Sequence, residues 1–257
     1  MEIDTATLPF DLTGRVALVT GGSRGLGHAM ARGLAAAGAT TILLARSETE
    51  LTRAKAALEK VGGPIYTLVS DLSHRSAAAE AIGRAAELAG PIDILLHDAG
   101  SSHLQPVDAI DDASWDGILE LDLSAAMALT RAVVPGMRAK RAGRIIYISS
   151  TFGEVSLPGR GSYSAAKAGL RGFARGAALD LGPDGITVNC IAPGPFRTEL
   201  TEAAGATHNL QAFSDATALG RWGRPEELAG VVVLLASDAG SYITGTTLFV
   251  DGGYTAR

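Results

Sequence analysis

Short apolar runs alternate with longer segments rich in Ala and Leu along this chain. Each run is continuously apolar rather than alternating in polarity, which is typical of strands covered on both faces. Seven such runs predict strands, at residues 16–20, 41–45, 65–69, 92–96, 144–149, 186–192 and 246–250.

Between these runs lie segments of helical composition. The predicted helices cover residues 27–37, 48–60, 77–88, 113–138, 163–181 and 225–236. Ser162 and Asp112 stand where N-terminal caps are expected, and Gly38 and Gly182 stand where helix-terminating glycines are expected. Strands that alternate with helices predict an α/β protein with a Rossmann-like, doubly wound, seven-stranded parallel sheet.

The whole chain, residues 1–257, is expected to form a single domain, because no linker, repeat or change in composition divides it. One long irregular segment, residues 193–224, mixes Pro, Gly, Thr and charged residues. A segment of that length in a compact domain predicts a substrate lid. The alternative is a disordered surface insertion.

Composition narrows the classes of function. The sequence is 47% hydrophobic and 19% charged, which suits a sizeable core and argues against disorder. A net charge of -5 offers no basic surface for nucleic acid. Residues 1–10 lack a signal-peptide pattern, and the longest apolar run is too short to span a membrane. The single cysteine, Cys190, cannot form an internal disulfide and lies in an apolar run, which is typical of a buried strand residue. We therefore expect a cytoplasmic protein.

A glycine-rich turn follows the first predicted strand and leads into the first helix. From residue 20 it reads Thr-Gly-Gly-Ser-Arg-Gly-Leu-Gly. Glycine lets the backbone turn sharply and approach a pyrophosphate, whose charge is then met by the helix N-terminus. This spacing between a strand and a helix predicts a dinucleotide site that includes Gly21, Ser23, Gly25, Leu26 and Gly27.

The second predicted strand indicates which nicotinamide cofactor is bound. NAD enzymes usually place an acid after this strand to bond the adenosine ribose hydroxyls. Here Arg46 and Ser47 follow the strand, with no acid before Glu48. Arg46 and Arg24 of the glycine turn can form charge-assisted hydrogen bonds with a 2′-phosphate. The sequence therefore predicts NADP(H) in preference to NAD(H).

Tyr163 and Lys167 stand four residues apart in a predicted helix, so their side chains share one face. A phenol exchanges protons poorly near neutral pH unless a cation favours its phenolate, and Lys167 can supply that cation. Tyr and Lys at this spacing are also common surface neighbours. The pair gains weight from the glycine turn and from Ser150, upstream of the tyrosine.

Together these motifs resemble the short-chain dehydrogenase/reductase family over residues 12–253. The resemblance also rests on Asn-Cys-Ile-Ala-Pro-Gly at residues 189–194, followed by Thr198. Residues 220–227 and 250–253 are similar to the branch that holds 3-oxoacyl-carrier-protein reductases, glucose dehydrogenases and gluconate 5-dehydrogenases. These motifs are specific for the family and not for a substrate.

The resemblance implies an oxidoreductase that transfers hydride between NADP(H) and a small-molecule carbonyl or secondary alcohol, such as a 3-oxoacyl compound, a sugar acid or another ketone. Tyr163 would be the general acid or base, Ser150 would hold the substrate oxygen, and Lys167 would bond the nicotinamide ribose. Further cofactor contacts are implied for Asp71, Leu72, Asp98, Ala99, Gly100, Pro193, Gly194, Phe196 and Thr198.

The chain departs from the family at two places. Where the family usually has Asn-Asn-Ala-Gly, this chain has His97-Asp98-Ala99-Gly100. Asp98 can accept hydrogen bonds but its carboxylate cannot donate them, and His97 is expected to be structural. Asp122 replaces an asparagine of the family's catalytic set. The asparagine acts through its backbone carbonyl, so we expect activity to survive with a changed pH dependence.

Other functions stay open at this point. A catalytically weak NADP(H)-binding module or regulator is compatible with the changes at Asp98 and Asp122. An epimerase or dehydratase would need a larger substrate domain, and the scattered histidines predict no metal site. Family members pair their long helices into dimers and their last strands into tetramers, so a homotetramer is expected.

The substrate pocket is expected from residues 101–105, 152–160 and 196–222. His103, Arg160 and Arg197 in these segments can attract an anionic group. The alternative is that all three are solvated loop residues.

Overall fold

The fold is a parallel β-sheet with helices on both faces. The computed structural model describes residues 9–198 and 210–256. Its strands are β1 Val16–Thr20, β2 Thr40–Ala45, β3 Ile65–Val69, β4 Ile94–His97, β5 Gly143–Ile148, β6 Ile186–Pro193 and β7 Thr247–Val250. They form one sheet in the order β3-β2-β1-β4-β5-β6-β7, with every neighbouring pair parallel. The prediction of a doubly wound, seven-stranded Rossmann-like sheet is confirmed.

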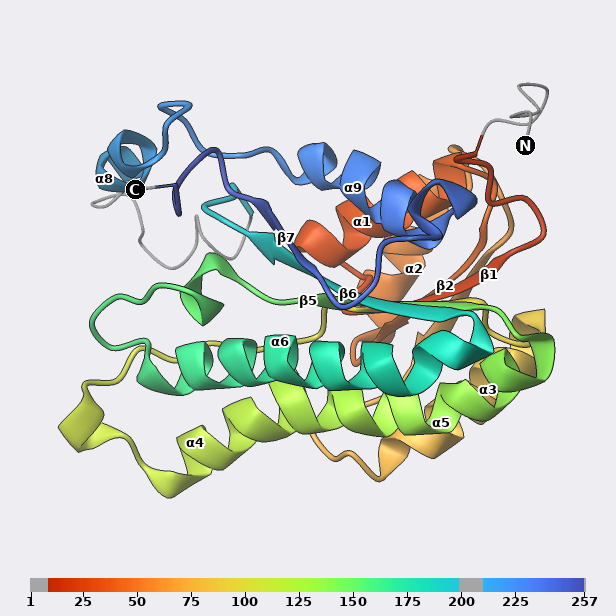
Figure 1. Ribbon diagram of the computed structural model, residues 1–257, viewed down its shortest axis with the longest axis horizontal. Helices are drawn as coiled ribbons and strands as arrows, with labels where there is room; N and C mark the ends of the chain where they lie inside the picture. Colours follow the sequence, from red (N-terminus) through yellow and green to blue (C-terminus); the bar gives the residue numbers. More distant parts are fainter. Residues whose placement is uncertain (1–8, 199–209, 257) are drawn as a thin grey trace.

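Helices cover both faces of this sheet. Their bounds are α1 Gly25–Ala36, α2 Glu48–Leu58, α3 Ala77–Ala89, α4 Asp112–Leu119, α5 Ala125–Lys140, α6 Gly161–Leu181, α8 Leu210–Ala216 and α9 Ala229–Ala236. Figure 1 shows α1, α2 and α9 on one face and α3, α5 and α6 on the other. Within the described residues, no helix is both long and apolar enough to cross a bilayer.

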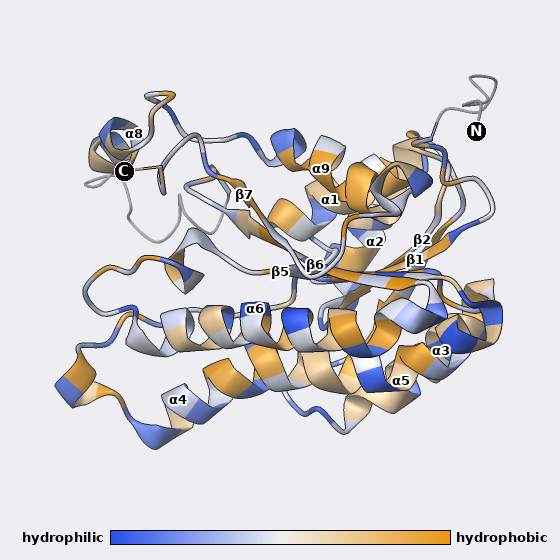
Figure 2. Ribbon diagram, in the orientation of Figure 1, coloured by the Kyte–Doolittle hydropathy of each residue, from blue (hydrophilic) through white to orange (hydrophobic). Residues whose placement is uncertain are grey.

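Two apolar clusters fill the space between the sheet and its helices. Successive residues of a strand point to opposite faces, so Leu18 of β1 packs in the cluster with α3, α5 and α6, whereas Val19 packs in the cluster with α1, α2 and α9. Figure 2 shows apolar residues along the strands and the helices that cover them. Burial of one such side chain contributes about 1.5–3 kcal/mol. The strand ends that carry the site are therefore held from both sides.

The starts of α4 and α6 differ from the predictions by one and two residues. Helix α6 begins at Gly161, so Ser162 lies inside it and does not cap it. Asp111, not Asp112, caps α4, because its carboxylate accepts a hydrogen bond from the Ser114 N–H at 2.8 Å. Ser, Asp and Asn favour both caps and first turns, so composition alone does not separate adjacent positions.

Both glycines expected at helix ends lie there, but only Gly38 has a left-handed conformation. Gly38 follows α1 with φ +98°, a conformation that favours glycine. Gly182 instead opens a 3₁₀ turn, Gly182–Asp184, directly after α6. The left-handed residue there is Gly185, with φ +74°.

The long helix predicted for residues 113–138 is interrupted. A π-helical turn, Glu120–Ser124, separates α4 from α5. A π turn holds one more residue than an α turn and is frequent at functional sites. Asp122 lies in this turn and is fully buried. Periodicity predicts the helical segment but not the extra residue, because both flanking helices keep the same apolar pattern.

Candidate active site

One cavity of about 910 Å³ lies at the carboxyl edge of the sheet, the edge where open α/β sheets bind ligands. The predicted site residues that line it are Gly21, Ser23, Arg24, Gly25, Leu26, Arg46, Asp71, Leu72, Asp98, Ala99, Gly100, Asp122, Ser150, Tyr163, Lys167, Pro193, Gly194, Phe196 and Thr198. The structure therefore brings together all of the predicted catalytic and cofactor-binding residues except Gly27. Arg197, a candidate of the expected substrate pocket, is exposed and does not line the cavity.

Gly27 shapes the glycine turn without lining the cavity. A Cβ on Gly27 would collide with the Gly21 carbonyl oxygen and lie 2.7 Å from Asp98 Oδ2. Gly21 itself has φ +69°, and a Cβ there would lie 3.0 Å from the Ala99 nitrogen. The first turn of α1 thus packs directly on the glycine turn and on the segment after β4. The resulting helix N-terminus, which opens on the cavity, suits a pyrophosphate.

The segment after β4 is tied to β1 by one hydroxyl. Thr20 Oγ1 accepts hydrogen bonds from the N–H groups of Asp98 and Ala99, at 3.2 and 3.1 Å. The same oxygen lies 2.9 Å from His97 Nδ1. His97 is buried outside the cavity lining, and burial, with the Lys167 charge adding, lowers its pKa to about 3. A histidine held neutral in this way supports the strand end and does not carry protons at neutral pH.

Asp98 is a partly buried carboxylate in the cavity wall, beside the glycine turn. It accepts a hydrogen bond from the Gly27 N–H, as its place beside α1 allows. Burial raises the pKa of Asp98 to about 6, and the nearby Asp122 charge acts in the same direction. Lys167 and the Gly27 hydrogen bond oppose this rise without cancelling it. An amide at this position would not titrate.

Lys167 lies beside the tyrosine ring. Its ammonium is 5.5 Å from the Tyr163 ring centroid and donates a hydrogen bond to the Ile148 carbonyl oxygen at 2.9 Å. Burial alone would lower the pKa of Lys167, but the charges of Asp122, Tyr163 and Asp98 outweigh it and raise that pKa above its usual value. Lys167 is therefore a permanent cation at neutral pH.

Asp122 pairs directly with this lysine. Its Oδ1 lies 2.9 Å from Lys167 Nζ, and its Oδ2 accepts a hydrogen bond from the Ser101 N–H at 2.8 Å. Both charged groups are buried, so the pair is shielded from solvent. The added carboxylate expected near Lys167 therefore makes an ion pair, and the π turn places it there.

Ser150 completes the group around the tyrosine. It follows the end of β5, is largely buried, and its hydroxyl accepts a hydrogen bond from the Phe152 N–H at 3.1 Å. Its hydroxyl proton stays available to a substrate oxygen, because a hydroxyl both accepts and donates. Ser150, Tyr163 and Lys167 line the same cavity as the glycine turn.

An acidic residue that sequence reasoning missed lies beside the glycine turn, at the end of the cavity expected to hold the adenosine. Glu50 of α2 lines the cavity, accepts a hydrogen bond from the Ser23 hydroxyl at 3.1 Å and lies 3.5 Å from Arg24. Arg46 lines the same end, and Asp71 lies close enough for the Arg46 charge to help lower its pKa, after the larger effect of the Ser73 backbone N–H. An acid that directly follows the strand is visible in the sequence pattern, whereas Glu50 reaches the cavity from the first turn of α2.

Aromatic side chains from distant segments form one wall of the cavity. Phe213 of α8 lies 5.4 Å from Trp222 and 6.4 Å from Tyr254 between ring centroids, and Tyr254 lies 6.5 Å from Phe152. Sequence reasoning did not name Tyr254, which follows the last strand and Gly252-Gly253. Residues 199–209 of the predicted lid lie outside the described residues.

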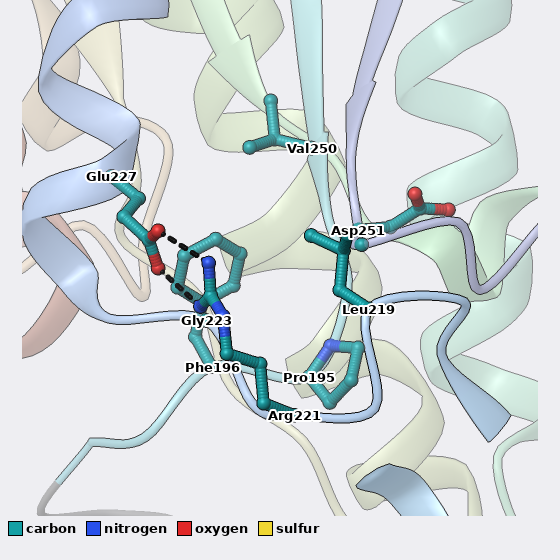
Figure 3. A pocket seen from close by; sticks show the side chains of 9 residues that line it. Pro195, Phe196, Leu219, Arg221, Gly223, Glu227, Val250 and Asp251 are labelled. Carbon is teal, nitrogen blue, oxygen red and sulfur yellow. Dashed lines mark hydrogen bonds and ion pairs between the residues drawn. The ribbon is translucent and has the colours of Figure 1, made fainter. Parts of the chain in front are cut away.

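A second pocket of about 90 Å³ adjoins the described part of the predicted lid, residues 193–224 (Figure 3). Arg221 points toward Glu227 there and donates two hydrogen bonds of 2.8 Å to its carboxylate. This guanidinium is neutralised within the fold.

The described geometry matches known proteins over nearly the whole chain. Residues 21–255 match the family model described as enoyl-(acyl carrier protein) reductase. The chain is 36% identical over 250 residues to gluconate 5-dehydrogenase of Gluconobacter oxydans, with 96% of each chain covered. It is 40% identical over 240 residues to 3-oxoacyl-[acyl-carrier-protein] reductase of Escherichia coli. The matched region covers 93% of this chain and 97% of the reductase.

Solved structures give the same result. A gluconate 5-dehydrogenase from Burkholderia cenocepacia, in complex with NADP and tartrate, superposes with a TM-score of 0.92 at 35% identity, over 97% of this chain and 98% of that one. A 3-oxoacyl (acyl-carrier-protein) reductase from Agrobacterium tumefaciens with NADP bound superposes with a TM-score of 0.93 at 32% identity, over 99% and 100%. The chain belongs to the short-chain dehydrogenase/reductase family. Within that family of oxidoreductases it lies in the branch of these two activities.

The raised pKa of Asp98 predicts how stability depends on pH. Between the usual value of 3.8 and about 6 the folded protein binds a proton more tightly than the unfolded chain, so its stability falls as pH rises. Asp98→Asn should remove this fall, and relative to the wild type the variant should gain up to about 3 kcal/mol above pH 6. Urea unfolding of the wild type and of Asp98→Asn from pH 4 to pH 8 measures the free energy of unfolding of each protein. Parallel stability curves across this interval would contradict the prediction.

Proposed function

We propose that the protein is an NADP(H)-dependent oxidoreductase that interconverts a carbonyl compound and a secondary alcohol, with Tyr163 as general acid and base. The observation that carries this proposal is the Tyr163 ring beside the Lys167 ammonium, in one cavity with Ser150 and the glycine turn. A binding module does not require a phenol and a buried cation at the nicotinamide end. Acid–base chemistry on a carbonyl does.

The cavity residues fit a dinucleotide. Gly21 and Gly27 leave no side chain between the turn and a pyrophosphate, and the first turn of α1 would meet its charge. Asp71 and Leu72 would contact the adenine, and Lys167 would bond the nicotinamide ribose. When bound, the nicotinamide supplies or accepts the hydride.

The chain's own residues handle the oxygen and its proton. The Ser150 hydroxyl would donate to the substrate oxygen and stabilise the charge that develops on it. The Tyr163 phenol would give its proton to that oxygen in reduction and take it back in oxidation. The Lys167 cation, buried and hydrogen-bonded to the Ile148 carbonyl, would stabilise the phenolate left behind.

The NADP(H) preference is the finer part of the proposal. NADP is present in several structures of relatives, including the two described above. Arg46 and Arg24 border the adenosine end of the cavity and suit a 2′-phosphate, although Glu50 partly neutralises Arg24. The names of the relatives give two substrate classes to test, gluconates and 3-oxoacyl compounds. The lid role of residues 193–224, the homotetramer and the cytoplasmic location stay predictions.

A catalytically weak NADP(H)-binding module is the second candidate, and one observation favours it. Lys167 is already engaged by Asp122 and the Ile148 carbonyl, so fewer of its donors are left for a ribose. Such a module would bind NADPH without turning over any carbonyl compound.

Removal of the phenol separates these two functions. Tyr163→Phe should lower kcat for carbonyl reduction by about 10²–10⁴-fold and leave NADPH binding nearly unchanged, because only the proton is lost. The measurement is NADPH oxidation with a panel of keto acids, oxoacyl esters and ketoses. Tyr242→Phe, at a fully exposed tyrosine, is the matched control. If Tyr163→Phe turns over a carbonyl compound as fast as the wild type does, Tyr163 is not the general acid and base. If the wild type binds NADPH but turns over no carbonyl compound, the result supports the NADP(H)-binding module.

The cofactor preference is tested by charge reversal. The wild type should bind NADPH more tightly than NADH, and Arg46→Asp should weaken NADPH binding at least tenfold, because it replaces a charge-assisted hydrogen bond by repulsion. Fluorescence titration of both nucleotides gives the dissociation constants. Arg53→Asp, at an exposed arginine of α2, controls for net charge. Tighter binding of NADH by the wild type would contradict the arginine argument.

The Asp122–Lys167 ion pair predicts a shift in the pH profile. In Asp122→Asn the Lys167 cation acts on Tyr163 without an opposing carboxylate, and the phenolate is favoured more strongly. The rising limb of the kcat/KM profile for alcohol oxidation should therefore move to lower pH. Rates from pH 6 to pH 11 in the oxidative direction test this. An unchanged limb, with activity retained, would show that the carboxylate does not act on the phenol.

A further inference from the structure

Two arginines of the cavity, Arg46 and Arg160, form no ion pair with a described carboxylate, and Arg46 lies at the end proposed for the 2′-phosphate. Arg24 lies beside Glu50, Arg171 beside Glu154, and Arg221 is held by Glu227 (Figure 3). No carboxylate within residues 9–198 and 210–256 forms an ion pair with Arg160, which also lines the cavity. A cation that is left unpaired beside a deep cavity is available to a ligand.

Arg160 is nevertheless held in place. Its guanidinium carbon lies 5.6 Å from the centroid of the Phe152 ring, and its Nη1 donates a hydrogen bond to the Ser102 hydroxyl. Stacking on a ring and one hydrogen bond fix the plane of the guanidinium and leave other N–H donors free. A planar fork of this kind matches the two oxygens of a carboxylate.

Its position separates Arg160 from the cofactor arginines. Arg24 and Arg46 follow β1 and β2, whereas Arg160 follows β5, which lies beyond β4 in the sheet. The Phe152 ring, on which the Arg160 guanidinium stacks, also makes an edge contact with the Tyr163 ring, at 6.5 Å between centroids. Arg160 therefore stands one aromatic ring away from the reacting group, at the end of the cavity opposite the adenosine.

We propose that Arg160 binds a carboxylate on the substrate, so that the protein acts on an oxo acid or a hydroxy acid and discriminates against its neutral counterparts. This inference rests on the proposed function, because it names the substrate class of the same site. His103 and Ser102 from the loop after β4 lie on the same side and add polar atoms. The wall formed by Phe213, Trp222 and Tyr254 would pack on the carbon chain between the carbonyl and the carboxylate.

Matched pairs of probes isolate the charge. The probes are acetoacetate, 4-oxopentanoate and 5-oxohexanoate, each with its methyl ester, assayed with NADPH. For at least one length the wild type should favour the acid over the ester in kcat/KM by about 10- to 100-fold, as one charge-assisted hydrogen-bonded contact provides. Arg160→Met should reduce this preference to near unity, chiefly through KM, and Arg160→Lys should retain part of it.

Two controls keep the result specific. Arg175→Met, at an exposed arginine of α6, the helix that Arg160 directly precedes, should leave the acid-to-ester ratio unchanged. The NADPH dissociation constant and the thermal unfolding midpoint of Arg160→Met should match those of the wild type. If the methionine variant does not fold, Arg160→Gln keeps the side-chain length and polarity without the charge and takes its place.

A binding measurement distinguishes failure of the inference from failure of the proposed function. Quenching of tryptophan fluorescence, with Trp222 in the cavity wall, reports binding of glutarate to the NADP-loaded protein. Glutarate binding that is lost in Arg160→Met, without turnover of any ketone, would support the carboxylate site and refute the reaction. Turnover of acids and esters with equal efficiency, or an equal loss for both in Arg160→Met, would overturn the inference and leave the reaction standing.

Discussion

The geometry of the site depends on the buried ion pair between Lys167 and Asp122. A lone ammonium at this depth would be strongly unfavourable, because burial removes its hydration. Asp122 and the Ile148 carbonyl together hold it in one place, beside the Tyr163 ring. Since Asp122 also accepts the Ser101 N–H, the same carboxylate fixes the loop after β4 that borders the cavity. One interaction thus positions the cation and the loop at once.

The carboxyl edge of the sheet balances its charges locally. The partly buried Asp98 and the fully buried Asp122 lie near one buried ammonium, and loss of hydration, more than the Asp122 charge, raises the pKa of Asp98. Where the family has amides, this chain therefore has groups whose charge depends on pH or on a partner. In the cavity wall Arg24 is paired with Glu50, whereas Arg46 and Arg160 form no ion pair with a carboxylate among the described residues.

The fold and most of the cavity lining followed from the sequence, because continuous apolar strands and the glycine turn are local signals. Helix boundaries were less accurate, as the cap at Asp111 and the start of α6 at Gly161 show, because neighbouring polar residues have similar preferences. The π turn was not predictable, since it leaves the apolar period of α4 and α5 intact. Glu50 and Tyr254 were missed because their contacts join segments that are distant along the chain or lie past the last strand.

The contact of Glu50 with Ser23 and Arg24 has a consequence for the evolution of cofactor use. With the proposed dinucleotide in the cavity, selectivity would be a difference between attraction of a 2′-phosphate by the arginines and its repulsion by one glutamate on α2. A single substitution at position 50 would then change the cofactor preference, while the residues around Tyr163 stay as they are.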